Sequence, residues 1–360
     1  MQTQRSQINY EGQNIYIGID AHLKSWTVSV IGEAMSYQTF SQPPTVEALT
    51  SYLAHHFPGG IYHSVYEAGF SGLWAHYQLV QAGINNIVVN PADVPTSQKE
   101  KLQKTDPVDS KKLARSLRSG DLDSIYILGK STMENRSLVR LRATIVKDLV
   151  RFKQRIKSFL YYFGIKFPEV FSNGGSHWSR RFIKWLKEEV PIHLELGGQT
   201  MRFMVQEAEQ LRNLLLEITR EIRTLSKTDK YSSQMKLLRT IPGVGFITSI
   251  TFLVEIENIE RFQNSDHFAG FVGLIPTTHS SGEKNVDGEM TFRGQKVLRK
   301  ALIESSWKAA CYDPSLSLSY NNYTKRMDSN KAIIRIARKV LNRMYFVLKN
   351  NKEYVPGVVK

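Results

Sequence analysis

Four acidic residues have the types and positions needed to gather carboxylates round a metal ion: Asp20, Glu67, Asp106 and Asp109. Asp20 ends the apolar run IYIGID and Glu67 follows IYHSVY, so each lies at the end of a predicted strand. Asp106 and Asp109 are three residues apart near the start of a predicted helix, so they can face the same point. Hard divalent cations bind several anionic oxygens at once, and phosphoryl transfer can use two such ions about 4 Å apart. The four positions therefore favour a metal-dependent phosphoryl-transfer site.

Each of these acids also has a purely structural interpretation. Asp106 precedes Pro107, a pattern typical of a helix N-cap, and Asp109 would favour the positive end of the helix dipole. Asp20 is explained equally well as a turn residue after its strand. Glu67 is explained as a surface residue, although a buried strand precedes it. The metal-site hypothesis depends on the four acids occurring together in a basic chain.

The elements that would position these acids can be read from the apolar pattern of the first part of the chain. Strands are expected over residues 15–20, 26–32, 36–40, 61–69 and 86–90, with helices over 45–57, 71–83 and 108–120. Residues 124–128 (SIYIL) are expected to close the unit as a further strand. A three-stranded meander that passes into alternating strands and helices predicts a mixed sheet with helices on its faces. In that order the first and fourth strands are neighbours, so Asp20 and Glu67 should emerge side by side.

After residue 129 the apolar periodicity becomes helical. One stripe predicts an amphipathic helix that spans on the order of 45 Å from residue 131. It consists of Leu138, Leu141, Ile145, Leu149, Phe152, Ile156, Phe159 and Phe163. A second stripe, from Met204 to Leu225, should pair with the first, either within one chain or between chains. We therefore expect three domains: residues 1–129 with the sheet, a helical coiled-coil arm over 130–234 with an insert at 164–200, and a mostly α-helical domain over 235–360.

The composition restricts the class of protein. Lys and Arg exceed Asp and Glu by 48 − 33 = 15 in a chain of 360 residues, which predicts binding to a polyanion, with nucleic acid ahead of an anionic membrane surface. An apolar content of 41% excludes a disordered tail or a fibrous repeat. Cys311 is the single cysteine, so an internal disulfide and a cysteine-only metal site are excluded. The longest uncharged stretch is interrupted by polar residues, so no membrane partner and a cytoplasmic location are expected.

Two basic segments could contact nucleic-acid phosphates. Residues 130–166 contain ten Lys or Arg against two acids, and residues 325–352 contain nine against one. In the second segment four cations oppose the apolar stripe of a predicted helix, so one side could pack while the other follows a phosphate backbone. These cations are Arg335, Arg338, Lys339 and Arg343. The alternative is that both segments are solvated helix faces.

The sequence IPGVG, which contains Gly243 and Gly245, predicts a tight turn between two helices. A turn of this helix-hairpin-helix kind leaves free backbone N–H groups at a helix start, where a phosphate can bind. A plain turn between helices is the alternative.

Taken together, the acidic motifs resemble a known family. YIGIDAH with Asp20, YEAGFSG with Glu67 and KTDPVDSKKLA with Asp106 and Asp109 are similar to the DEDD motif of the bridge-RNA-guided insertion-sequence one-ten transposases, which include Piv-type DNA invertases. The resemblance covers nearly the whole chain and is weakest at 164–200. It implies an α/β ribonuclease-H/resolvase-like (RuvC-like) N-terminal domain whose four acids bind Mg²⁺, with Mn²⁺ as a substitute.

The stretch FAGFVGLIPTTHSSGEK resembles a second signature of that family, in which a serine just before a glycine is the nucleophile. By that match the nucleophile is Ser281, next to Gly282, with Ser280 as the neighbouring alternative. Without the resemblance, the stretch would be interpreted as a polar loop. A serine oxygen that attacks a DNA phosphodiester conserves the bond energy in a phosphoserine link. The resemblance implies that serine and acids meet across protomers of a dimer or tetramer.

The function implied by the resemblance is that of a DNA transposase or site-specific recombinase. It would cleave and rejoin donor and target DNA through phosphoserine, guided by a noncoding RNA. Two other functions stay open: a junction resolvase or nuclease that uses water, and a non-enzymatic nucleic-acid-binding protein. The sequence leaves open the target and donor sequences, the oligomer number, and the choice among excision, insertion and inversion.

Overall fold

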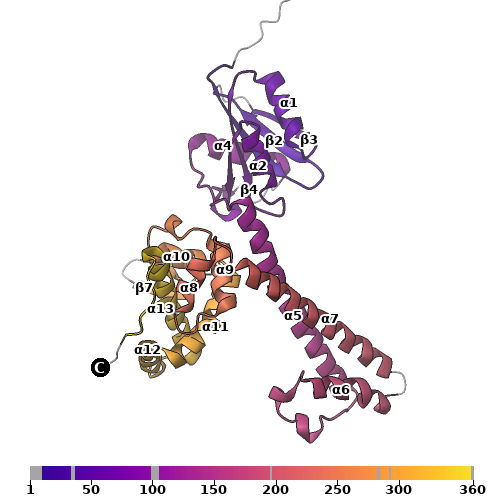
Figure 1. The fold of residues 1–360 in the computed structure, drawn as a ribbon. Helices are drawn as coiled ribbons and strands as arrows, with labels where there is room; N and C mark the ends of the chain where they lie inside the picture. The colour runs from indigo at the N-terminus through magenta and orange to yellow at the C-terminus, as the bar shows by residue number, and fades with distance from the viewer. Residues whose placement is uncertain are drawn as a thin grey trace, which may run out of the picture. The chain divides into compact units, whose positions relative to one another are not determined.

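The computed structural model describes residues 10–33, 37–98, 105–194, 197–281, 284–291 and 293–357. The chain divides into two compact units, residues 1–127 and 128–360 (Figure 1). Within the described ranges, every helix is either too short or too polar to cross a membrane.

The N-terminal unit is built on a five-stranded mixed sheet. Its strands are β1 (Asn14–Ala21), β2 (Trp26–Ile31), β3 (Tyr37–Gln42), β4 (Ile61–Glu67) and β5 (Asn85–Val89). Their order is β3-β2-β1-β4-β5, with β1, β2 and β3 antiparallel to one another in turn and β4 parallel to both β1 and β5. The predicted mixed sheet is confirmed, and so is the predicted pairing of the first and fourth strands.

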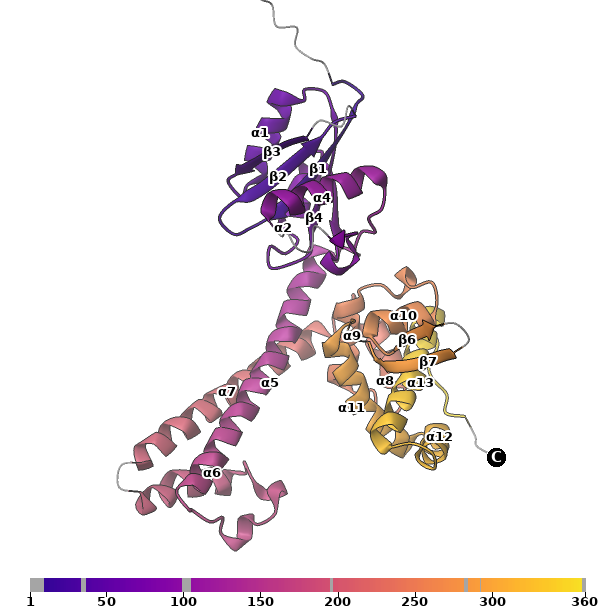
Figure 2. The same ribbon diagram turned by 180° about the vertical axis from the view of Figure 1, so that it is seen from behind.

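Helices cover both faces of this sheet (Figures 1 and 2). The isoleucines at 15, 17 and 19 of β1 are buried with α1 (Val46–His56) and α2 (Trp74–Gln81), because alternate side chains of a strand point to the same face. The opposite face carries α4 (Asp106–Ser119), whose Leu113 packs with Val65 and Val89. A short 3₁₀ turn, η1 (Pro91–Asp93), follows β5.

The strand expected over residues 124–128 is not formed. Ser124 makes a single isolated bridge with Val89, and the Ile125 N–H donates to the Val88 carbonyl over 2.8 Å. Ile125 and Ile127 nevertheless pack against the core of the sheet. The apolar alternation of SIYIL therefore reports burial, whereas a strand also requires a continuous ladder of backbone hydrogen bonds.

The second unit begins with a long helical hairpin. Helix α5 (Lys130–Tyr162) has 33 residues and spans about 50 Å. It packs along α7 (Gly197–Leu225), which confirms that the two apolar stripes pair and shows that they do so within the chain. Ile145, Leu149 and Ile156 are buried as expected, but Leu141 and Phe163 are each 47% exposed. A straight helix drifts relative to a strict heptad, so part of the stripe turns away from its partner.

The insert expected at residues 164–200, for which the sequence predicts no shape, closes the far end of this helical hairpin. It contains the 3₁₀ turns η2 (Glu169–Phe171), η3 (Gly174–Ser176) and η4 (Val190–His193) and helix α6 (Arg180–Glu188). Phe182 and Leu186 of α6 are fully buried against residues of both long helices. The buried parts of the two stripes are therefore covered within one chain.

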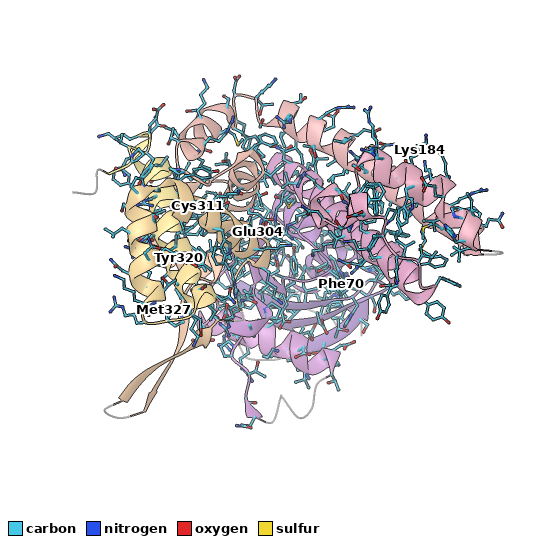
Figure 3. All side chains as sticks on the ribbon, turned by 90° about the horizontal axis from the view of Figure 1, so that it is seen from below. Phe70, Lys184, Glu304, Cys311, Tyr320 and Met327 are labelled. Atoms are coloured by element: carbon cyan, nitrogen blue, oxygen red, sulfur yellow. The ribbon has the colours of Figure 1, made fainter. Side chains whose placement is uncertain are left out.

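The rest of the second unit is mostly α-helical, as predicted, with a small β-hairpin. Its helices are α8 (Ser232–Arg239), α9 (Phe246–Ile256), α10 (Ser265–Val272), α11 (Lys296–Tyr312), α12 (Pro314–Thr324) and α13 (Ser329–Asn350). The 3₁₀ turn η5 (Ile259–Arg261) follows α9, and a hairpin of β6 (Pro276–Ser281) and β7 (Lys284–Met290) lies between α10 and α11 along the chain. Their core is continuous with that of α5 and α7 near the start of the hairpin. Cys311 is exposed on α11 (Figure 3).

A buried ion cluster ties the long helix to this core. Glu255 of α9 is 1% exposed and accepts hydrogen bonds from Arg136 Nε over 2.8 Å and from Arg140 Nε over 2.6 Å. Glu257, just after α9, accepts bonds from the Gly129 N–H and from Thr132 Oγ1, and so caps the start of α5. The first turns of α5 are therefore fixed to α9.

Candidate functional site: an acidic cluster beside the central strand

A glycine in β1 allows helix α4 to lie directly against the sheet. A Cβ atom at Gly18 would be 2.1 Å from the Ser110 carbonyl oxygen and 2.5 Å from the Ala114 nitrogen, so only glycine fits there. Ser110 Oγ also hydrogen-bonds to Ser29 Oγ of β2 over 2.8 Å. Strand and helix backbones are therefore in contact one helical turn after Asp106 and one residue after Asp109.

The two-residue period of the strands places Asp20 and Glu67 on this same face. Gly18 is aligned with Val65 in the β1–β4 register, and both face α4. Asp20 and Glu67 each lie two residues further along their strands, so they point to the face that α4 covers. The start of α4 then brings its own two acids to the ends of these strands.

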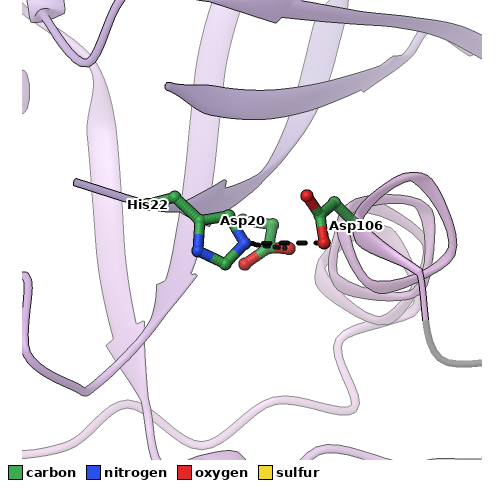
Figure 4. Close-up of side chains that lie close together, drawn as sticks. All are labelled: Asp20, His22 and Asp106. Carbon is green, nitrogen blue, oxygen red and sulfur yellow. Dashed lines mark ion pairs between the residues drawn. The ribbon is translucent and has the colours of Figure 1, made fainter. Parts of the chain in front are cut away.

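Asp20, His22 and Asp106 form the first part of the cluster (Figure 4). The His22 Nε2 atom is 3.3 Å from Asp20 Oδ2 and 3.5 Å from Asp106 Oδ1. One ligand atom from each of the three side chains lies within 4.8 Å of the others. The imidazole therefore stands between a carboxylate of the sheet and a carboxylate of the helix.

Lys112 connects the other two acids. Its ammonium group donates to Asp109 Oδ1 over 3.0 Å and lies 3.6 Å from Glu67 Oε1. The Lys112 side chain is only 7% exposed. A lysine is seldom buried to this extent unless carboxylates neutralise it, so Lys112 and these two acids form one electrostatic unit.

The pKa of Asp20 reports how close the acids are. Burial raises the pKa of its carboxyl above the usual value of 3.8, and the neighbouring charges of Asp106 and Asp109 raise that pKa further, while attraction to His22 opposes the rise. The charges of Asp106 and Asp109 thus act on Asp20, and Glu67 is joined to Asp109 through Lys112.

This donor set suits a hard divalent cation. Carboxylate oxygens are the preferred protein ligands of Mg²⁺ and Mn²⁺, and a histidine nitrogen is accepted by Mn²⁺. Asp20 and Asp106 offer oxygens on one side of the cluster, and Glu67 and Asp109 on the other. Among the described residues, Asp20, His22 and Asp106 are close enough together to share one ion. Metal binding by Glu67 and Asp109, which contact the Lys112 ammonium, stays a prediction.

His22 and Lys112 were not predicted as site residues, although the sequence contains a signal for each. His22 follows Asp20 by two residues, which in an extended chain places both side chains on one face. Lys112 follows Asp109 by three residues on a helix, a spacing at which opposite charges pair. The contacts of His22 with Asp106 and of Lys112 with Glu67 join separate elements and had no such signal.

The predicted N-cap at Asp106 is displaced by one residue. Thr105 is the N-cap of α4, Asp106 is the first helical residue and Pro107 the second. Asp106 and Asp109 both lie in the first turn, where the helix dipole favours a negative charge. The dipole thus stabilises the same carboxylates that the cluster gathers.

Ser281, the predicted nucleophile, is the last residue of β6 and pairs with Lys284 of β7. The stretch around it is therefore a strand of a hairpin, whereas the sequence without the resemblance indicated a polar loop. The side chains of Ser280 and Ser281, and residue Gly282, lie outside the described part of the structure. The choice between the two serines stays a prediction.

The two glycines predicted to bind phosphate differ in their surroundings. Gly243 has φ +85°, and a Cβ atom there would lie 2.4 Å from the Ser305 carbonyl oxygen, so this glycine is required for packing on α11. Gly245 is the N-cap of α9, has open space around its Cα, and leaves the helix start without a side-chain cap. Of the two, Gly245 retains the free N–H groups on which the prediction depends.

The basic residues of α13 are largely engaged within the protein. Arg343 lies 3.4 Å from the fully buried Asp313, and Arg338 pairs with Asp266. Arg335 and Lys339 lie over the ring of Tyr323, at 5.7 and 5.9 Å from its centroid, and both are exposed. Phosphate binding by this helix stays a prediction, and Arg335 and Lys339 are the members best placed for it.

Comparison with known protein families gives two matches. The DEDD transposase model of the insertion-sequence IS110 type matches residues 17–163, and the model of the IS116/IS110/IS902 transposase family matches residues 235–321. The first range contains the whole acidic cluster, and the second contains the turn at 241–245 and the serines of β6.

Individual relatives agree with these matches. The protein y4qE of Sinorhizobium fredii, described as a transposase, is 27% identical over 243 residues, which is 67% of this chain and 57% of that protein. The transposase for insertion element IS1533 of Leptospira borgpetersenii is 27% identical over 249 residues, 68% of this chain and 70% of the relative. The pilin gene-inverting protein of Moraxella bovis is 32% identical over 139 residues, 35% of this chain and 40% of the relative.

Proposed function

Because this chain belongs to the IS116/IS110/IS902 family of transposases, we propose that it cuts and rejoins DNA with the carboxylates of its N-terminal unit and a serine hydroxyl of its C-terminal unit. The observation that carries the proposal is the convergence of Asp20, Asp106 and Asp109, with Glu67 joined to them through Lys112. A transposase binds DNA, which agrees with the formal net charge of +15.

The DEDD domain implies a divalent metal, and we expect Mg²⁺, with Mn²⁺ as a substitute. Asp20, Glu67, Asp106 and Asp109 would hold it. When bound, such an ion offsets the charge of a phosphodiester and of the oxygen that leaves it. His22 and Lys112 keep the carboxylates in position between the sheet and α4.

The proposed nucleophile is Ser281. Its Oγ forms a bond to a DNA phosphorus while the bond from that phosphorus to a deoxyribose oxygen breaks. The proton of the serine hydroxyl passes to a neighbouring proton acceptor, and the departing deoxyribose oxygen takes up a proton. The phosphoserine link keeps the energy of the broken bond, so the reverse attack by a DNA hydroxyl can rejoin the strand and release the serine. The similarity to a pilin gene-inverting protein supports rejoining, because inversion of a gene requires that cut strands are joined again.

We also propose that a noncoding guide RNA pairs with donor and target DNA, and that the chain acts as a dimer or tetramer in which serine and acids come from different copies. The resemblance of the DEDD and serine signatures to the bridge-RNA-guided transposases supports both statements. The basic composition suits contact with two nucleic acids at once.

The proposal is tested by trapping the covalent intermediate. Full-length protein is incubated with MgCl₂, junction DNA of its insertion element and RNA transcribed from the flanking region, and DNA bound to protein is detected on a denaturing gel. The adduct should form with the natural chain, persist in Ser280→Ala and disappear in Ser281→Ala. It should also disappear in Asp20→Asn and Glu67→Gln.

The two alternative functions, a nuclease or resolvase and a non-enzymatic nucleic-acid-binding protein, predict other results in this assay. If Ser281→Ala still cuts DNA, and no adduct is seen with the natural chain, then water is the nucleophile and the protein is a nuclease or resolvase. If neither acidic variant changes any activity or the response to Mg²⁺, the acids are structural. If only Ser280→Ala loses the adduct, the nucleophile is displaced by one residue.

A further inference from the structure

A basic cavity lies in the C-terminal unit, and the residues that line it include none of those considered above for catalysis. It has a volume of about 470 Å³ and is formed by the end of α7, the turn after it, helix α8 and the first residue of α9. This size is within the range of pockets that hold small molecules or single groups of a larger ligand. Its cations are Arg223, Lys227, Lys236 and Arg239.

The charge of this cavity is not balanced by protein groups. No acidic side chain lines it, and within the described part of the chain none of its four cations has an ion-pair partner within 4.0 Å. Lys236 and Arg239 are three residues apart on α8, a spacing at which like charges destabilise a helix. An anion between them would remove this repulsion.

The lining also supplies hydrogen-bond donors in defined positions. Ser232 contributes a hydroxyl group, whereas the Ser226 hydroxyl already donates to the Arg223 carbonyl oxygen over 2.8 Å. The Arg223 guanidinium lies over the Phe246 ring, 4.9 Å from its centroid, and this stacking limits its orientation. Phe246 is the first residue of α9, whose N-terminus lacks a side-chain cap, so the positive end of that helix adds to the field.

We propose that this cavity binds a phosphodiester group of a nucleic-acid backbone. The two non-bridging oxygens of a phosphodiester carry its negative charge and can accept from Lys, Arg and Ser donors together. The chemistry recognises the backbone and no particular base, so the contact serves to position a strand on the helical unit. The inference requires only that the protein binds nucleic acid and is independent of the serine chemistry.

Salt-dependent binding tests this assignment. The dissociation constants of full-length protein for a labelled DNA duplex and for a labelled RNA hairpin are measured by fluorescence anisotropy across a KCl series, in the natural chain and in Lys236→Gln/Arg239→Gln. Each lost phosphate contact lowers the slope of log K against log salt by about 0.9, so the slope should fall by about 1 to 2 and affinity by about tenfold or more at low salt. The ligand that loses affinity identifies the occupant as DNA or RNA.

A matched control removes two lysines of α11 that do not line the cavity. Lys300→Gln/Lys308→Gln changes the charge by the same amount and should change affinity less than twofold. Equal effects in the two double variants, on both ligands, would show that only net charge matters and would overturn the proposal.

Chemical protection gives a second readout that does not depend on a variant. Acylation of surface lysines, followed by mass spectrometry, should show Lys227 and Lys236 protected when DNA or RNA is bound, and Lys300 and Lys308 unchanged. Protection by inorganic phosphate at equal ionic strength, without protection by either nucleic acid, would show a site for a free anion only and would refute the backbone assignment.

Discussion

Substitution of Gly18 by alanine should separate helix α4 from strand β1. The added Cβ would lie 2.1 Å from the Ser110 carbonyl oxygen and 2.5 Å from the Ala114 nitrogen. Both neighbours are backbone atoms of a regular helix, so no side chain can rotate away and the whole helix must shift. Overpacking of this kind costs typically 1–3 kcal/mol, and contact with backbone favours the upper end, about 3 kcal/mol.

The expected consequences are both thermal and catalytic. For a unit of residues 1–127, a loss of about 3 kcal/mol lowers the melting temperature by roughly 10 °C. Asp106 and Asp109 move with α4, while Asp20 stays on β1, and a misplacement of about 1 Å can reduce a reaction rate by roughly a hundredfold. Formation of the covalent adduct should therefore fall by at least that factor.

Gly32→Ala is the matched control, because a Cβ atom there would meet nothing within 4 Å. Both variants are measured in the full-length chain by calorimetry, by the adduct assay and by hydrogen exchange. Gly18→Ala should speed the exchange of amides in α4 and leave those of α1 nearly unchanged. If Gly18→Ala melts, exchanges and reacts like Gly32→Ala, then the close contact of β1 and α4 does not position the acids and the reasoning is wrong.

Three further substitutions test the electrostatics. The raised pKa of Asp20 means that, without metal, its charged form opposes folding, so the free energy of unfolding falls as the pH rises through that pKa. Asp20→Asn should therefore raise the melting temperature at neutral pH, and this gain should shrink towards pH 4. An equal gain at both pH values would contradict the reasoning. Lys112→Met removes the ammonium group shared by Glu67 and Asp109, so the metal-free variant should melt at a lower temperature than the natural chain. Millimolar MgCl₂ should raise the melting temperature of the variant by more than it raises that of the natural chain. An unchanged response to MgCl₂ would show that Lys112 does not act on these acids. Glu255→Gln leaves two arginines beside a buried neutral group and should cost about 3 kcal/mol in urea unfolding, while a cost below about 1 kcal/mol would mean that the cluster behaves as an exposed ion pair.

The sheet of the first unit could be predicted because its signals are local. The run IYIGID has strand length and alternation, and the order of strands and helices along the chain restricts the topology to a mixed sheet. Once β1 and β4 are neighbours, the positions of Asp20 and Glu67 at their ends follow from strand periodicity. The spacing of Asp106 and Asp109 on one helix is equally local.

Other features depend on which residues meet across the fold. The apolar alternation of residues 124–128 indicates that these side chains are buried. It does not tell whether their backbone pairs with a neighbouring strand, and only a single bridge is formed. The exposure of Leu141 depends on how α5 is rotated against α7, and that rotation is fixed by packing along the whole hairpin. The sequence places Arg343 on the basic face of a helix, but its distance of 3.4 Å from Asp313 depends on how two separate helices approach each other.

The acidic cluster combines features that the sequence predicts with features that only the tertiary structure decides. Residue types, strand ends and helical spacing were enough to select its four carboxylates, because each of these properties belongs to a short segment. His22 between two acids, Lys112 buried between the other two, and the backbone contact at Gly18 arise only when α4 settles on β1. Such contacts are set by the shape and charge of surfaces that come together after the segments have formed, and no pattern within one segment encodes its distance to another.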